Sequence, residues 1–256
     1  MDLDLEDKVV LITGGASGIG AAIVRAVVGE GAVAVIADRS AELPVHLKDA
    51  AGTVYLVAGD LTVVENCKQA VDQTLERFHR LDALVNNAGV NDRVGLERGS
   101  PAAYVASLER NLLHYYNMMY FALPALKESR GSVVNIASKT AITGQGDTSG
   151  YASAKAAILG LTREWAVELA PYGIRSNAVV PAEVMTPLYR SWLQTFPDPD
   201  EKMAGIIARI PLGKRMTTPD EIASMVTFLI SAKASHITGQ HLFVDGGYVH
   251  LDRATP

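Results

Sequence analysis

The chain of 256 residues has one cysteine, Cys67, no long apolar run and no surplus of basic residues. A single cysteine excludes an internal disulfide framework. No apolar run approaches the roughly 20 residues of a membrane span, and the acidic first segment, MDLDLEDKVV, does not resemble a basic secretory signal. A net charge of −5 offers no cationic surplus to neutralise phosphates. We therefore expect a cytoplasmic protein without nucleic-acid or membrane partners.

Histidine is also scarce, with six residues in the chain. His46, His79 and His236 do not have the spacing of metal ligands, so we expect no metal site. His114 is expected to be packed in the interior and not to act in catalysis.

Short apolar, β-branched runs alternate with segments of helical apolar spacing along the whole chain. The expected strands are 8–13, 32–38, 53–58, 82–87, 131–138, 174–180 and 240–245, and the expected helices are 19–31, 63–78, 101–127, 151–170 and 218–231. This alternation predicts one α/β domain over residues 1–256, a doubly wound Rossmann fold with about seven parallel strands and helices on both faces. The segment 182–213 interrupts the alternation and is expected to be an irregular lid over the substrate.

A glycine-rich loop follows the first expected strand and opens the first expected helix. Gly14, Gly18 and Gly20 in TGGASGIG permit a tight turn, close approach to a pyrophosphate and close packing of helix on strand. The pyrophosphate would bind at the helix N-terminus, where backbone N–H groups are free. Asp38 ends the second expected strand, at the position where an acidic residue binds the adenosine ribose. The combination predicts a dinucleotide site and favours it over a purely structural glycine turn.

Asp38 also bears on the choice of dinucleotide. A carboxylate accepts hydrogen bonds from both ribose hydroxyls and repels a 2′-phosphate. Ser17 stands in the loop where a basic residue often serves NADP. Arg39 could instead hold a phosphate or stack on adenine. NAD is favoured, and NADP stays open as the alternative.

The segment SGYASAKAAILG places Tyr151 and Lys155 four residues apart, on one face of an expected helix. The simplest interpretation is a surface pair worth about a few tenths of a kcal/mol. The alternative is a catalytic phenol activated by an ammonium group. We favour the second because Ser138 precedes the pair and a dinucleotide loop lies upstream.

Taken together, these motifs resemble those of the short-chain dehydrogenase/reductase family over about residues 7–250. The matching segments are TGGASGIG, GDL (59–61), NNAG (86–89), Asn111, Ser138, YASAK, IRSNAVVPAEVMTP (174–187) and ITGQHLFVDGG (237–247). The resemblance implies a homotetramer that pairs helices around 102–128 and 151–170. It also implies cofactor contacts from Gly14, Ser17, Gly18, Ile19, Gly20, Asp38, Arg39, Asp60, Leu61, Asn87, Ala88, Gly89, Tyr151, Lys155, Pro181, Val184 and Thr186.

The resemblance further implies a catalytic tetrad of Asn111, Ser138, Tyr151 and Lys155. Tyr151 would take the hydroxyl proton of the substrate as hydride leaves its carbon, and Ser138 would bind the substrate oxygen. Lys155 would hold the nicotinamide ribose, and Asn111 would position a water that relays protons. We expect the ammonium of Lys155, with the positive nicotinamide, to lower the pKa of Tyr151.

One departure from the family lies at Pro181-Ala182, where relatives have Pro-Gly. If the backbone there requires a positive φ, alanine costs roughly 1 kcal/mol.

The segments that follow the cofactor motifs are expected to contain the residues that contact the substrate. We expect contacts from Asn91, Ser138, Lys139, Gln145, Tyr151, Glu183, Tyr189 and Trp192, a polar lining with two aromatic rings. These segments resemble those of family members that oxidise L-fucose. The resemblance implies NAD-dependent oxidation of the C1 hydroxyl of an aldose, first of all L-fucose, to the lactone. A keto-deoxy sugar acid and a steroid-like secondary alcohol remain as alternative substrates. A cofactor-binding protein without catalytic activity remains as an alternative of a different class.

Overall fold

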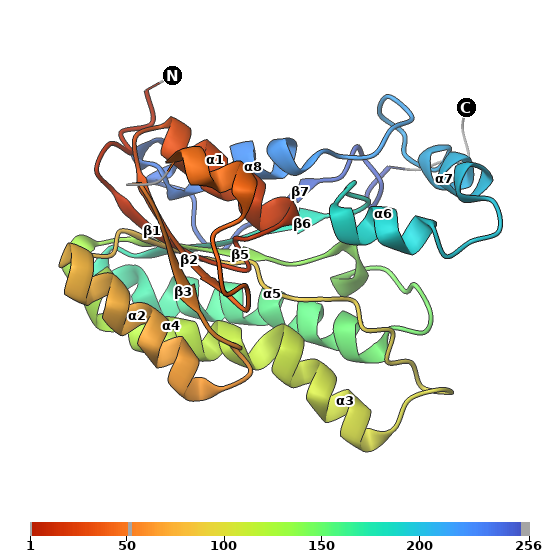
Figure 1. The fold of residues 1–256 in the computed structure, drawn as a ribbon, viewed down its shortest axis with the longest axis horizontal. Helices are drawn as coiled ribbons and strands as arrows, with labels where there is room; N and C mark the ends of the chain where they lie inside the picture. Colours follow the sequence, from red (N-terminus) through yellow and green to blue (C-terminus); the bar gives the residue numbers. More distant parts are fainter. Residues whose placement is uncertain (1, 51–52, 252–256) are drawn as a thin grey trace.

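The computed structural model describes residues 2–50 and 53–251. Within them, seven parallel strands form one sheet in the order β3-β2-β1-β4-β5-β6-β7 (Figure 1). The strands are β1 (Val9–Thr13), β2 (Val33–Asp38), β3 (Val54–Ala58), β4 (Ala83–Asn86), β5 (Ser132–Ile136), β6 (Arg175–Pro181) and β7 (His241–Val244). The strand order reverses between β1 and β4, which is where a doubly wound sheet binds its ligand. The predicted fold class is confirmed.

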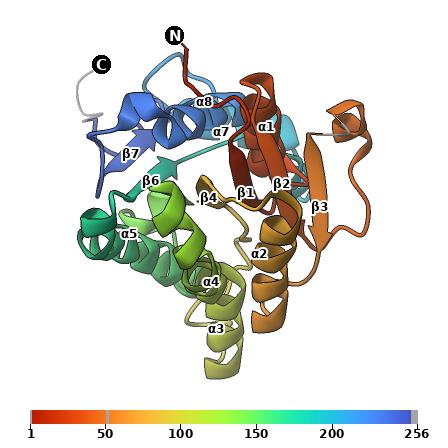
Figure 2. The same ribbon diagram turned by 90° about the vertical axis from the view of Figure 1, so that its left-hand side faces the viewer.

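Helices cover both faces of the sheet (Figure 2). The helices are α1 (Gly18–Gly29), α2 (Val64–Phe78), α3 (Pro101–Leu108), the π-helix η2 (Glu109–Leu113), α4 (His114–Ser129), α5 (Ser149–Leu169), α6 (Pro187–Leu193), α7 (Pro199–Ile207) and α8 (Pro219–Ile230), with short 3₁₀ turns η1 (Val45–Ala50), η3 (Lys139–Ala141), η4 (Ala170–Tyr172) and η5 (Ala232–Ala234). Val10 and Ile12 of β1 join the core under α1 and α8, whereas Val9 and Leu11 join the core under α2, α4 and α5. This alternation buries the strand on both sides.

The segment expected as one helix over 101–127 is divided by η2, so that prediction was wrong in its continuity. Asn111 lies inside the π-helix and is fully buried. Its Oδ1 accepts from Val90 N at 2.7 Å and its Nδ2 donates to Ser107 O at 3.0 Å. A buried side chain that bonds both a distant loop and the preceding turn stabilises the wider turn, and π-turns often occur at functional sites.

The segment 182–213 contains two short helices, so it is not irregular as predicted. Thr186 caps α6 by accepting from Tyr189 N at 3.1 Å, and Pro187 follows at the first helical position. Asp198 caps α7 in the same way, and Pro199 follows it. Proline is favoured at the first helical position because it has no N–H to satisfy. Both helices lie at one end of the sheet (Figure 1).

The single cysteine and one of the two tryptophans lie in the interior. Cys67 is buried in α2, and burial raises the pKa of its thiol to about 12, so the thiol is neutral and unreactive. Trp165 of α5 is buried in the core on that side of the sheet. Across residues 2–50 and 53–251, no helix is long and apolar enough to cross a membrane, and no group of three His, Cys, Asp or Glu residues could hold a metal ion.

Candidate active site

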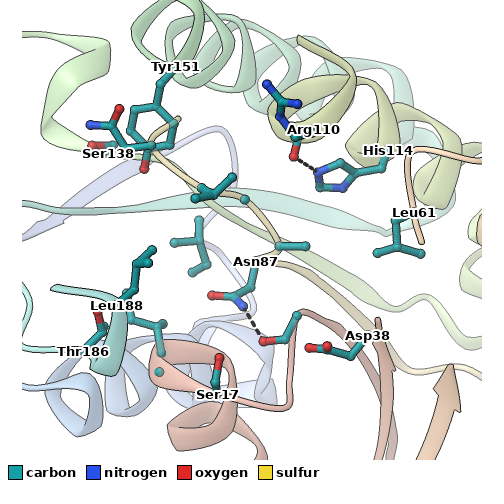
Figure 3. Close-up of a pocket in the computed structure, with 18 of the residues that line it drawn as sticks. Ser17, Asp38, Leu61, Asn87, Arg110, His114, Ser138, Tyr151, Thr186 and Leu188 are labelled. Atoms are coloured by element: carbon teal, nitrogen blue, oxygen red, sulfur yellow. Dashed lines mark hydrogen bonds between the residues drawn. The ribbon is translucent and has the colours of Figure 1, made fainter. Parts of the chain in front are cut away.

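A cavity of about 650 Å³ opens at the carboxyl ends of the strands, over the junction of β1 and β4 (Figure 3). Every predicted cofactor residue except Gly20 lines it. These lining residues are Gly14, Ser17, Gly18, Ile19, Asp38, Arg39, Asp60, Leu61, Asn87, Ala88, Gly89, Tyr151, Lys155, Pro181, Val184 and Thr186. Residues far apart in the sequence thus converge on one groove.

The glycine-rich loop has the shape that a diphosphate requires. Gly14 and Gly18 have φ values of +66° and +55°, which L side chains rarely adopt. A Cβ at Gly20 would lie 2.1 Å from Gly14 O, so Gly20 allows close packing behind the loop and does not line the cavity. Helix α1 begins at Gly18, and its free N–H groups favour an anion. The loop fits the diphosphate of a dinucleotide.

Asp38 is fixed at the end of β2 beside this loop. Its Oδ2 accepts from Ala16 N at 3.1 Å, and its Oδ1 accepts from Ser40 N at 3.0 Å. A carboxylate has about four acceptor sites, so two remain for ribose hydroxyls. Arg39 is exposed and lines the same end of the cavity.

A clamp between the ends of β1 and β4 shapes the middle of the cavity. Asn87 Nδ2 donates to Thr13 O at 2.9 Å and to Gly14 O at 3.1 Å, and Ala88 N donates to Thr13 Oγ1 at 3.0 Å. Figure 3 shows Asn87 at the centre of the groove, between Asp38 and Tyr151. The NNAG segment therefore fixes both the glycine loop and the cavity floor.

The far end of the cavity is lined by His114 and Arg110, which sequence analysis did not place in the site. His114 is buried, as predicted, and it also lines the cavity beside Arg110, whose backbone oxygen lies 3.1 Å from His114 Nε2. Burial lowers the pKa of His114 to about 4, so the ring is neutral. Hydrogen bonds from Thr62 lower the pKa of the neighbouring Asp60. The sequence signal for His114 was its place three residues after Asn111, one helical turn along.

Ser138 and Tyr151 face each other at the opposite end of the groove (Figure 3). Ser138 Oγ accepts from Thr140 N at 3.2 Å and from Thr140 Oγ1 at 3.1 Å. Its own hydrogen therefore remains to donate toward Tyr151 or a substrate oxygen. Burial raises the pKa of Tyr151 to about 12, and the hydroxyl of Ser138 opposes that shift.

Lys155 lies on the predicted face of α5 but is 2 % exposed. Its Nζ donates to Tyr115 Oη at 2.9 Å and to Ile136 O at 2.8 Å, and it lies 5.6 Å from the centre of the Tyr151 ring. Burial lowers the pKa of Lys155 to about 7. For the protein groups alone, burial disfavours the charged forms of both Tyr151 and Lys155. The lower Tyr151 pKa expected with a bound nicotinamide stays a prediction.

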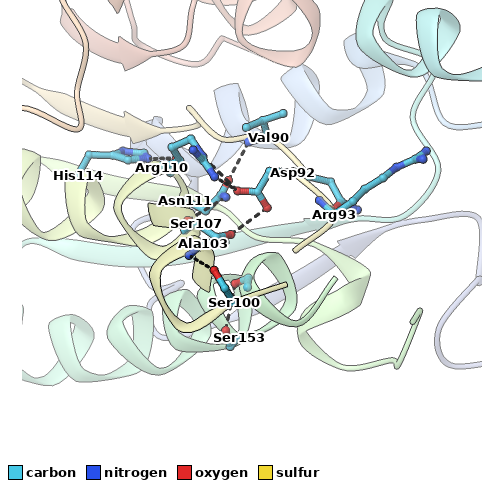
Figure 4. A network of polar contacts seen from close by, with 12 residues as sticks. Val90, Asp92, Arg93, Ser100, Ala103, Ser107, Arg110, Asn111, His114 and Ser153 are labelled. Atoms are coloured by element: carbon cyan, nitrogen blue, oxygen red, sulfur yellow. Dashed lines mark hydrogen bonds and ion pairs between the residues drawn. The ribbon is translucent and has the colours of Figure 1, made fainter. Parts of the chain in front are cut away.

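Asn111 lies behind the cavity wall and does not line it. Its neighbours form the network of Figure 4, in which Asp92 accepts from Ser107 Oγ at 2.9 Å and pairs with Arg110 at 2.7 Å. This network fixes η2 against the loop at Val90. The water relay expected of Asn111 stays a prediction.

The predicted substrate residues fall into two groups. Asn91, Ser138, Tyr151 and Tyr189 line the cavity. Lys139, Gln145, Glu183 and Trp192 do not: Gln145 is exposed in the loop before α5, and Trp192 packs edge-to-face on Tyr189 with ring centres 5.0 Å apart.

Lys139 and Glu183 form an ion pair with side chains only 9 % and 11 % exposed. Tyr189 Oη donates to Glu183 Oε2 at 2.7 Å, which joins helix α6 to this pair. The loop at Ala182 carries no strain from a left-handed backbone, because its φ is not positive. The cost anticipated for alanine there does not arise.

Comparison with known proteins agrees with this geometry. The family model described as enoyl-(acyl carrier protein) reductase matches residues 14–249. L-fucose dehydrogenase of Bos taurus is 40 % identical over 243 residues, which cover 94 % of this chain and 88 % of that protein.

Two solved structures share the fold closely. The crystal structure of Cj0485 dehydrogenase is 49 % identical with a TM-score of 0.96, covering 100 % of this chain and 99 % of that one. The ligand-free aldohexose dehydrogenase of Thermoplasma acidophilum is 34 % identical with a TM-score of 0.90, with the same coverage. The matches thus extend over the cofactor groove and the lid alike.

Proposed function

Because the chain belongs to the short-chain dehydrogenase/reductase family, whose oxidoreductases use NAD or NADP, we propose that it oxidises the C1 hydroxyl of an aldose to the lactone. L-fucose is the first candidate substrate and NAD the preferred cofactor. The observation that carries the proposal is the convergence of Ser138, Tyr151 and Lys155 on one groove that ends at Asp38.

The chemistry follows from the positions of these side chains. Tyr151 Oη takes the proton of the C1 hydroxyl, and Ser138 Oγ donates a hydrogen bond to the same oxygen. The C1 hydrogen leaves with its electron pair, and C1 becomes the carbonyl carbon of the lactone. When bound, the oxidised nicotinamide supplies the hydride acceptor and a positive charge that favours the phenolate.

NAD is supported by the fixed carboxylate of Asp38. A 2′-phosphate would meet this negative charge at the end of β2, whereas ribose hydroxyls would find free acceptor sites.

The lining of the substrate end supports a polyhydroxylated ligand. Asn91 and Tyr189 line the cavity, and the Trp192 ring packs edge-to-face on the Tyr189 ring without lining the cavity itself. The sugar names of the similar proteins above support the same class. Lys139 is already paired with Glu183, so it is not a free cation for the carboxylate of a sugar acid.

The test is NADH formation across a panel of aldoses, keto-deoxy sugar acids and steroid-like secondary alcohols. We expect the highest kcat/KM for L-fucose or an arabinose or galactose of related configuration. Tyr151→Phe should lower kcat by about 10²-fold or more. Absence of turnover for every aldose would overturn the substrate proposal, and full activity of Tyr151→Phe would overturn the catalytic assignment.

We further propose that the protein assembles as a homotetramer through the outer faces of α4 and α5. Leu113, Tyr116 and Tyr120 recur at helical spacing and are 47 %, 54 % and 63 % exposed. Val167 of α5 is 73 % exposed, and at Gly160 an added Cβ would meet open space. Exposed apolar side chains of this kind are typical of a protein–protein interaction surface.

A further inference from the structure

Tyr115 contacts the catalytic lysine but is not among the residues that line the cavity. It lies in the first turn of α4, four residues after Asn111, and its side chain is fully buried. Its Oη accepts from Lys155 Nζ at 2.9 Å and donates to Ile136 O at 2.9 Å. A buried phenol with both roles satisfied is held in one orientation.

The ammonium of Lys155 requires acceptors because it is buried with 2 % of its surface exposed. It has three N–H donors, of which one bonds Tyr115 Oη and one bonds Ile136 O. The third is left for the cavity that Lys155 lines. Phenylalanine at position 115 would leave a single protein acceptor and would free the ammonium to turn.

We propose that Tyr115 is a positioning residue that holds the Lys155 ammonium and directs its remaining N–H toward the bound cofactor and Tyr151. The inference rests on the proposed function, because Tyr115 would orient a group of the proposed active site. Ile136 stands two residues before Ser138 at the end of β5. Tyr115 therefore fixes α4, β5 and α5 to one another where three catalytic groups meet.

Tyr115 acts through Lys155 and does not itself exchange protons, because burial holds its pKa well above the usual value of a phenol. The titratable groups that face Lys155 are Tyr151 from its own helix and Tyr115 and His114 from α4. Strand β5 contributes the Ile136 carbonyl. The neutral amide of Asn111 lies nearby, because a Cβ built on Gly89 would lie 3.1 Å from Asn111 Oδ1 and 3.4 Å from Lys155 Nζ.

The experiment compares Tyr115→Phe with Tyr104→Phe. Tyr104 Oη also forms a hydrogen bond to helix α5, donating to Ser153 Oγ at 2.9 Å, but its bond is not to Lys155. Each variant loses one oxygen and one hydrogen bond to helix α5, and Tyr115→Phe also loses the hydrogen bond to Ile136 O. The first measurement is an NMR titration of protein with ¹³C-labelled lysine, in which Lys155→Arg identifies the Lys155 signal. This measurement requires no substrate.

We expect Tyr115→Phe to lower the pKa of Lys155 by about 1 pH unit and Tyr104→Phe to leave it unchanged. With the aldose found active, Tyr115→Phe should lower kcat about tenfold or more with a smaller change in the sugar KM, and its activity should fall at a lower pH on the alkaline side. An unchanged Lys155 titration, or equal losses in both variants, would overturn the inference. If the titration moves but no aldose is oxidised, the proposed function fails while the positioning role stands.

Discussion

Burial acts on Tyr151 and Lys155 in opposite directions on the pH scale, and in both cases it disfavours charge. The pKa of Lys155 falls from 10.5 to about 7, and the pKa of Tyr151 rises from 10.0 to about 12. Lys155 retains two acceptors, Tyr115 Oη and Ile136 O, which limit the cost of burying the ammonium. A cationic ring bound beside Tyr151 would offset part of the cost of making this buried phenol anionic.

This balance predicts a distinct dependence of stability on pH. Between about pH 7 and 10.5 the unfolded state holds the Lys155 proton and the folded state does not, so the free energy of unfolding rises with pH by up to about 1.4 kcal/mol per pH unit. Between about pH 10 and 12 the folded state retains the Tyr151 proton, so stability falls again. The free energy of unfolding, measured in urea, should rise with pH between pH 7 and 10 more steeply for the wild type than for Lys155→Met. Parallel curves would contradict the assigned burial of the ammonium.

Asp38 predicts a change of cofactor preference. Asp38→Ser removes the carboxylate that, in the proposed complex with NAD, would accept from the ribose hydroxyls and would repel a 2′-phosphate. We expect kcat/KM for NAD to fall about tenfold and kcat/KM for NADP to rise, with the sugar KM little changed. Glu42→Gln, an exposed position just after this turn, serves as the control. An unchanged ratio of NAD to NADP efficiency would show that Asp38 does not select the cofactor.

At the scale of elements, the strands and most helices could be predicted because their apolar periodicity is a local property. The π-helix could not, because it depends on Asn111 bonding Val90 N in a loop 21 residues away. Helices α6 and α7 were missed because they have only 7 and 9 residues, although a capping residue followed by a proline opens each one. The glycine loop and Asp38 were found from their spacing and most other residues of the groove from the family resemblance, whereas the partners of Lys155 and Lys139 depend on tertiary contacts.

The ion pair between Lys139 and Glu183, which Tyr189 of α6 joins, can be tested by substitution. Glu183→Gln leaves Lys139 as a buried charge without its ion partner, which should cost about 3 kcal/mol of unfolding free energy, and it weakens the bond from Tyr189. The KM for the aldose should rise severalfold while kcat changes less. Asp220→Asn, which breaks an exposed pair with Arg25, should cost under about 1 kcal/mol.

A double variant, Lys139→Met with Glu183→Gln, separates the two effects. Removing both charges should recover part of the lost stability, because no buried charge is then left unpaired. The raised KM should remain, since Tyr189 still lacks its carboxylate acceptor. A double variant less stable than Glu183→Gln would argue that the pair does not act as a unit.

For the whole molecule, the groove and the proposed assembly surface are built on the same two helices. Lys155 projects from the buried face of α5, while Val167 projects from its exposed face. On α4, Tyr115 is fully buried beside Lys155, whereas Tyr116 lies on the outer face and is 54 % exposed. A neighbouring copy packed on these outer faces would brace the helices that hold Tyr115 and Lys155, so assembly and activity would be linked.

Tyr120→Glu combined with Val167→Glu tests this link. At a symmetric interface each introduced carboxylate approaches its own copy, so we expect light scattering to report a species smaller than a tetramer. The bracing of α4 and α5 would be lost with it, which should lower kcat while Ser138 and Tyr151 remain in place. Val45→Glu, at an exposed apolar side chain of η1 on the other side of the molecule, is the control and should change neither quantity. A double variant of unchanged mass would place the assembly surface elsewhere, and a smaller species with full activity would separate assembly from catalysis.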